Sequence, residues 1–112
     1  MRFGEQIRVW RLEKQIGLRE FARQIGLSPT FVSKFERDEF PPPGEPKLRE
    51  IARVLGKDAD LVTSLAKRIP SDLPPIIQEH PQELAAFLRT ARGLGAEQIR
   101  ELTEQARRLK RG

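Results

Sequence analysis

The chain has 112 residues, of which 38% are hydrophobic and 33% are charged, and its net charge is +5. This length suits one domain with an extension, and no window approaches the roughly 20 uncharged apolar residues that a membrane span needs. The lack of cysteine excludes disulfides and thiolate metal sites, and without an apolar leader segment a cytoplasmic location is expected.

Two helices are predicted at the start of the chain. Apolar spacing predicts the first from residue 3 to about residue 15, with Gly17 as its C-terminal stop. The second is expected at about residues 19–25, and Gly26 after it permits the positive φ of a tight turn. The inward side chains of the two helices are expected to be Phe3, Ile7, Arg11, Leu12, Phe21, Ala22 and Ile25.

Three more helices are predicted up to residue 69. Ser28 suits the N-cap and Pro29 the first position of a helix that runs to about residue 37 and buries Val32 and Phe35. The acidic, proline-rich residues 38–46 form a rigid loop. Helices then follow at about residues 47–55 and, capped by Asp58, at about residues 59–69. Their expected inward side chains are Leu48, Ile51, Ala52, Leu55, Leu61, Val62, Leu65 and Ile69.

Prolines at positions 70, 74 and 75 separate a C-terminal extension from this first part. Pro81 opens a helix in the extension, and a last helix is expected at about residues 96–110. Apolar side chains on that last helix follow spacings of 3, 4 and 3, which gives an a/d seam of about two heptads. A seam this short must pack on something to be stable. The large side chains Val9 and Trp10 either are half-buried against the fifth helix or form a docking face.

The positive charge is concentrated near the N-terminus, because residues 1–37 hold eight basic and four acidic side chains. Within them, LREFARQIGLSPTFVSKFER (residues 18–37) joins two short amphipathic helices through a glycine corner. This is the layout of a helix-turn-helix, whose second helix can lie in the major groove of DNA. For the charge alone, an ordinary solvated helical surface remains the alternative.

These residues resemble the Cro and phage-repressor type of helix-turn-helix, also called the XRE family. The resemblance covers residues 3 to about 69 and rests on Phe21-Ala22, Ile25-Gly26, Ser28-Pro29, Val32-Ser33 and Phe35-Glu36-Arg37, and on the segment LREIARVLG. It implies an all-α fold: a five-helix λ-repressor-like DNA-binding domain at residues 1–69, followed by a helical dimerisation or interaction extension at residues 70–112. It also implies a structural ion pair between Arg11 and Glu36.

The resemblance implies roles for further side chains. The residues expected to read bases are Thr30, Ser33 and Lys34, with phosphate neutralisation as the alternative for Lys34. The residues expected to contact the DNA backbone are Arg19, Arg23, Ser28, Phe31, Arg37 and Lys47; for Phe31 the alternative is that it covers the fourth helix. Relatives usually carry glycine at the position of Asp38, but aspartate also tolerates the left-handed region. The acidic loop argues against readout of the minor groove.

The expected function is sequence-specific binding of double-stranded DNA by a transcriptional regulator, a repressor that binds a palindromic operator as a homodimer. The expected dimer or partner contacts are Phe87, Leu88, Ile99, Leu102, Ala106 and Leu109. The main alternative is an antitoxin-like or protease-paired regulator, whose extension binds a toxin or a metallopeptidase and whose DNA binding is autoregulatory. A second alternative is an RNA- or translation-associated factor. Since His80 is the only histidine and no catalytic arrangement appears, no enzyme, cofactor or metal is expected.

Overall fold

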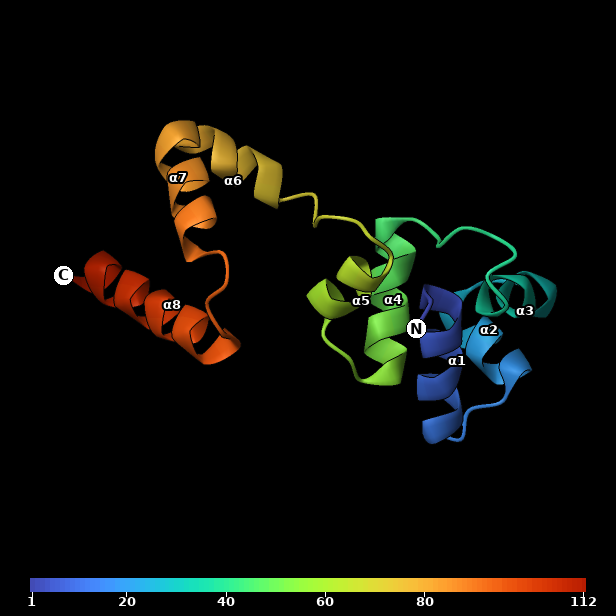
Figure 1. The fold of residues 1–112 in the computed structure, drawn as a ribbon. Helices are drawn as coiled ribbons and strands as arrows, with labels where there is room; N and C mark the ends of the chain where they lie inside the picture. The colour runs from blue at the N-terminus through green and yellow to red at the C-terminus, as the bar shows by residue number, and fades with distance from the viewer. The chain divides into compact units, whose positions relative to one another are not determined.

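The computed structural model describes residues 1–112 as eight α-helices and no strand, which confirms the predicted all-α fold (Figure 1). The chain divides into two compact units, Met1–Pro70 and Ser71–Gly112. The first unit contains α1 (Phe3–Glu13), α2 (Leu18–Ile25), α3 (Pro29–Glu36), α4 (Glu45–Leu55) and α5 (Ala59–Leu65). The second contains α6 (Leu73–Glu79), α7 (Pro81–Ala91) and α8 (Ala96–Arg111).

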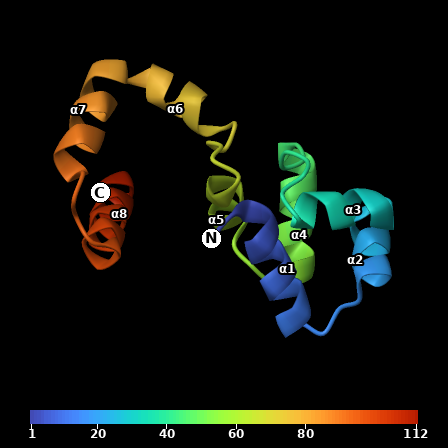
Figure 2. The ribbon, with the colours of Figure 1, turned by 45° about the vertical axis from the view of Figure 1, so that its right-hand side comes forward.

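One hydrophobic core holds the first unit together. Within this unit α2 packs on α3 and α4, α1 on α3, and α4 on α5 (Figure 2). The expected inward side chains of α2, α3 and α4 are buried, as predicted. The complete set of buried hydrophobic residues is Phe3, Ile7, Phe21, Ala22, Ile25, Val32, Phe35, Leu48, Ile51, Ala52, Leu55 and Val62.

Three predicted core residues are instead exposed: Leu12, Leu61 and Ile69. Since α5 ends at Leu65, Ile69 lies beyond the helix that was expected to bury it. On α5 the inward positions belong to Val62 and Thr63, and the Thr63 hydroxyl is satisfied by the Ala59 carbonyl at 2.8 Å. A buried polar side chain with such a bond costs little, which is why Thr63 can replace a leucine in the core.

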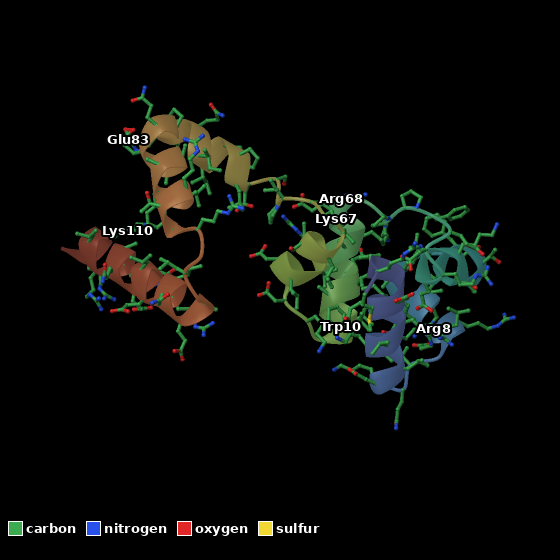
Figure 3. The ribbon with its side chains drawn as sticks, viewed as in Figure 1. Arg8, Trp10, Lys67, Arg68, Glu83 and Lys110 are labelled. Carbon is green, nitrogen blue, oxygen red and sulfur yellow. The ribbon has the colours of Figure 1, made fainter.

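Trp10 is half-buried and packs against the core cluster, which agrees with the first of the two alternatives for this residue. Lys57 Nζ lies 5.0 Å from the centre of the indole ring and covers it further. Trp10 and Arg8 leave α1 on opposite sides (Figure 3). The tryptophan therefore contributes to the stability of the first unit.

All five helices of the first unit are followed by a residue in the left-handed region. After α2 and α4 this residue is glycine, and the predicted positive φ at Gly26 is confirmed at 68°. After α1, α3 and α5 it is Gln15, Asp38 and Lys67, with φ of 58°, 59° and 58°. The prediction that Gly17 ends α1 is wrong, because Gly17 has extended backbone and forms the N-cap of α2. The tolerance expected of aspartate at position 38 is confirmed.

The second unit is built differently, because none of its side chains is buried. Within it α6 packs on α7, and Gly95 begins α8 with its N–H donating to Gln98 Oε1 at 3.0 Å. Large apolar side chains stay in contact with solvent along all three helices and in the connection between α7 and α8: Leu73, Ile76, Phe87, Leu88, Leu94, Ile99 and Leu109. A unit without a buried core gains little stability from the hydrophobic effect on its own.

Candidate nucleic-acid interface

The turn between α2 and α3 is fixed by its local sequence. Gly26 adopts a φ of 68° that other residues reach only with strain. Ser28 Oγ accepts a hydrogen bond from the N–H of Phe31 at 3.1 Å, and Pro29 starts the helix, so both predicted capping roles are confirmed. These features, with the packing of α2 on α3, give α3 one orientation.

The outer face of α3 carries the three side chains predicted to read bases. Thr30 is exposed, and Ser33 and Lys34 are half-buried one turn later. Thr30 and Ser33 line a shallow depression of ≈ 240 Å³ together with Arg19 and Arg37. Hydroxyl groups can donate to or accept from base edges, and arginines suit phosphates. The structure thus brings both kinds of side chain onto one surface.

A second depression, of ≈ 900 Å³, continues from this surface onto α1. Both depressions are lined by Leu18, Ser33 and Arg37, and the larger one also by Arg2 and Arg8. Arg2 and Arg8 are exposed and have no ion pair. Neither arginine was among the predicted site residues. The excess of basic side chains in residues 1–37 was the available signal, but charge alone does not say which arginines share a face.

A buried ion pair joins α1 to α3 behind this surface. Arg11 Nε donates to Glu36 Oε2 at 2.8 Å, and Arg11 Nη2 donates to Glu36 Oε1 at 2.9 Å. The two residues are only 6% and 5% exposed, and Arg11 Nη1 also donates to the Ile16 carbonyl at 2.8 Å. No buried polar side-chain atom in the structure lacks a partner. The pair that the resemblance implied is therefore present, bidentate and fully hydrogen-bonded.

The two arginines of α2 differ in their surroundings. Arg19 is exposed and has no hydrogen bond or ion pair, so its guanidinium is available to a ligand. Arg23 donates to Glu20 through Nε at 2.9 Å and through Nη2. This bond, with a smaller contribution from Gln24, lowers the pKa of Glu20 to about 2, and it raises the pKa of Arg23. Both partners are exposed, so Arg23 can leave Glu20 at little cost.

Arg37 and Lys47 also have partners within the chain. Arg37 forms an exposed ion pair with Glu39 at 3.1 Å, which a phosphate can replace. Lys47 Nζ donates to the Ile25 carbonyl at 2.5 Å and to Glu50 Oε2 at 3.2 Å. The lysine thus satisfies a carbonyl at the C-terminal end of α2, where a positive charge also suits the helix dipole. This contact gives Lys47 a structural role, and its expected phosphate contact stays a prediction.

For Phe31 the expectations were a contact with the DNA backbone or cover for the fourth helix, and the structure places its ring between two other aromatic rings. It is half-buried between the core residue Phe35 and the loop residue Phe40, with ring centres 6.1 Å and 5.3 Å away. Its ring therefore belongs to an aromatic cluster at the C-terminal end of α3. Phe40 was not among the predicted site residues, because an aromatic residue in a proline-rich loop carries no periodic signal.

The predicted contact residues of the second unit are accessible. Phe87, Leu88 and Ile99 are 48%, 52% and 48% exposed, and Leu109 is 83% exposed. Leu102 is half-buried and Ala106 exposed. On the eighth helix the four apolar residues share one side, as their spacing requires. They form an apolar strip that stays partly in contact with solvent.

The structure has neither a cluster of metal-binding side chains nor a helix that could span a membrane. No group of three or more His, Cys, Asp or Glu side chains lies together in a way that could hold a metal ion. None of the eight helices has the length and apolar content to cross a membrane.

Several solved structures resemble the chain, including the following three. SinR in complex with DNA, described as the master regulator for biofilm formation, aligns with a TM-score of 0.50 and 27% identity, over 54% of this chain and 95% of its own. The clp gene regulator ClgR from Corynebacterium glutamicum aligns with a TM-score of 0.51 and 24% identity, over 80% and 89%. A complex of the SinR and SinI proteins aligns with a TM-score of 0.52 and 21% identity, over 98% and 99%. The last two are likenesses of fold. No curated protein matches the sequence.

A family model described as a helix-turn-helix domain matches residues 2–65. The match spans more than half of the chain and takes in α1 to α5, and with them the turn at Gly26 and the outer face of α3. The chain belongs to the helix-turn-helix family of DNA-binding transcriptional regulators.

Proposed function

We propose that this regulator represses transcription by binding a palindromic operator in double-stranded DNA as a dimer. The observation that carries the proposal is the outer face of α3, where Thr30 and Ser33 lie beside Arg19 and Arg37, with Lys34 on the same helix. In helix-turn-helix complexes the second helix lies in the major groove. SinR, 27% identical over the matched region, has a structure in complex with DNA, which supports the same class of ligand here.

The proposed contacts divide into base readers and backbone contacts. Lys34 can donate to guanine O6 and N7, while Thr30 and Ser33 can donate or accept at base edges. Arg19 stands at the start of α2, where backbone N–H groups also favour a phosphate. The phosphate contacts are assigned to Arg19, Arg23, Ser28 and Arg37. Phosphate contacts fix the register of the protein on the duplex, and base contacts supply the specificity.

Alanine substitutions at Lys34 and Arg19 separate the two kinds of contact. The probe is the duplex that the wild-type protein enriches most from a randomised pool. Lys34→Ala is expected to weaken binding to that duplex roughly ten-fold and to change the preferred base at one position in each half-site. Arg19→Ala is expected to weaken all duplexes alike and to reduce the slope of log affinity against log salt by about 1. Fluorescence anisotropy over a salt series measures both.

Arg53→Ala is the matched control, because Arg53 is an exposed arginine on α4, outside the face of α3. It removes the same charge and should leave the base preference unchanged. An equal loss on every sequence from Lys34→Ala would refute base reading by that lysine. Wild-type binding without any preference among duplexes would refute the operator proposal itself.

We place the dimer contact on α8, along Ile99, Leu102, Ala106 and Leu109, with Phe87 and Leu88 on α7 as the second choice. The charges of α8 suit a second copy that runs antiparallel. Residues 96–104 carry the acids Glu97, Glu101 and Glu104 and one base, Arg100, while residues 105–111 carry only bases: Arg107, Arg108, Lys110 and Arg111. An antiparallel copy puts each acidic half beside a basic half. A two-fold dimer can then set two α3 helices about 34 Å apart on the operator.

Sedimentation tests the contact on α8. The wild-type protein is expected to sediment as a dimer and Leu102→Asp as a monomer, because a carboxylate cannot be buried in the apolar strip. Arg100→Gln is the control: it changes the net charge by the same amount on the other side of α8. An unchanged dimer in Leu102→Asp would eliminate the strip as the contact. A monomeric wild-type protein would favour a different protein partner, as in the antitoxin-like or protease-paired alternative.

A further inference from the structure

The loop after α3 is held in place at both ends. At its start, Asp38 Oδ1 accepts a hydrogen bond from the N–H of Gly4 in α1 at 2.8 Å. Near its end, Arg68 donates to the Pro42 carbonyl at 2.8 Å and to the Pro43 carbonyl (Figure 3). Three consecutive prolines restrict φ between these points. The residue just before the prolines therefore has a nearly fixed position.

That residue is Phe40, whose ring is anchored to the core through other aromatic rings. Its centre lies 5.3 Å from that of Phe31, and Phe31 lies 6.1 Å from the fully buried Phe35 in an edge-on arrangement. Such tilted and edge-on pairs are favourable for aromatic rings. Phe40 is still 37% exposed, so one part of the ring faces outward.

Lys34 lies over this ring. Its Nζ is 5.1 Å from the ring centre, within the range at which the ring face attracts an ammonium group. Lys34 has no ion pair, because the two acids of the loop have other partners: Glu39 pairs with Arg37, and Asp38 accepts from Gly4. A carboxylate would occupy the N–H protons of Lys34 and would have to be displaced. The ring holds the ammonium and leaves these protons free for an acceptor.

We propose that Phe40 is a positioning residue that determines specificity by holding the Lys34 ammonium where it meets a guanine edge. A lysine side chain loses much conformational freedom when it contacts a base, and the ring removes part of that freedom beforehand. The inference rests on the proposed function, since it assigns Phe40 to the same base contact. It places a determinant of base preference in the loop, outside α3 and outside the residues that touch DNA.

The test uses three substitutions in the full chain, alone and in combination. The probes are the duplex selected by the wild-type protein and duplexes that change the base read by Lys34. Phe40→Leu keeps an apolar side chain but removes the ring face, and it is expected to lower the discrimination at that base roughly three-fold. Phe40→Tyr keeps a ring face and is expected to restore it. The comparison is repeated with Lys34→Ala, in which Phe40→Leu should cause no further loss of discrimination.

A merely structural role for Phe40 would give a different pattern. Phe40→Leu would then weaken all duplexes equally and would do so in the Lys34→Ala protein as well. This result would overturn the proposal and leave the proposed function intact. The same holds if Lys34→Ala abolishes the discrimination between bases but Phe40→Leu leaves that discrimination unchanged. Loss of sequence preference in the wild-type protein would instead overturn both.

A second measurement needs no DNA. In the free wild-type protein the ring current of Phe40 is expected to shift the NMR signals of the Lys34 methylene groups next to Nζ upfield, and Phe40→Leu should abolish the shift. Phe40→Tyr should preserve it. Signals of Lys34 at ordinary lysine positions in the wild-type protein would overturn the proposal, whatever the binding data show.

Discussion

Glu36→Ala is expected to lower the free energy of unfolding by about 3–5 kcal/mol, the cost of breaking a buried ion pair. The substitution leaves the Arg11 guanidinium buried beside an empty space, with two of its hydrogen bonds lost. Ordinary domains are stable by only about 5–15 kcal/mol, so a large part of the stability disappears. Chemical denaturation followed by circular dichroism measures the change.

Two further variants show that the loss comes from the unpaired charge. Glu20→Ala removes an exposed carboxylate that is also paired with an arginine, and it should leave the stability nearly unchanged. The double variant Arg11→Met with Glu36→Leu removes both charges and should recover most of the lost stability. If Glu36→Ala unfolds at the same denaturant concentration as Glu20→Ala, the pair contributes nothing to the joint between α1 and α3.

Gly4→Ala has the second-largest expected effect, a loss of about 2–3 kcal/mol from overpacking. A Cβ at this position would stand 2.1 Å from the Phe35 carbonyl oxygen and 2.8 Å from the Glu36 carbonyl oxygen. Both belong to the backbone of α3, so a change of rotamer cannot relieve the clash. The helices must move apart, which also strains the hydrogen bond from Gly4 N to Asp38. Thermal unfolding measures the loss.

Gly17→Ala is the control for this prediction. Gly17 also adjoins a helix, but no atom lies within 4 Å of a Cβ built there, and its φ of −69° suits alanine. Its expected cost is below about 1 kcal/mol, from the weaker capping by alanine. Equal melting temperatures for the two variants would contradict the close approach of α1 and α3 at Gly4.

The sequence predicted the central helices well because several independent signals agreed there. In α2 and α4 the apolar spacing agreed with the glycine ends, and in α3 it agreed with the Ser28 cap and Pro29, so the predicted boundaries lie within two residues of the observed ones. In α1 and α5 the signals did not agree. Non-glycine residues end both helices, and the inward place of a leucine in α5 is taken by Thr63. Hydrophobic periodicity predicts that apolar side chains are buried. It cannot predict the burial of a hydroxyl group that donates a hydrogen bond to a carbonyl of its own helix.

For the candidate site, sequence reasoning found the face of α3 but not what surrounds it. The base-reading roles of Thr30, Ser33 and Lys34 were implied by the family resemblance and stay predictions. The engagement of Lys47 with the C-terminal end of α2, and that of Phe40 with Lys34, depend on tertiary contacts. Such contacts join residues from different elements of the fold, and no rule on short sequence spacing connects them. The requirement for glycine at position 4 was missed for the same reason, since it comes from the opposing helix.

The left-handed residues at the helix ends bear on how this protein can evolve. Of the three that are not glycine, only Asp38 makes a side-chain hydrogen bond in return for its strained backbone. The side chains of Gln15 and Lys67 make no hydrogen bond, so nothing offsets the strain of their left-handed backbone. Neither residue has a proposed role in DNA binding. Replacing either residue with glycine or asparagine can relieve this strain and stabilise the folded protein. The lineage thus has a margin available to offset destabilising changes on α3 that would give it a new operator.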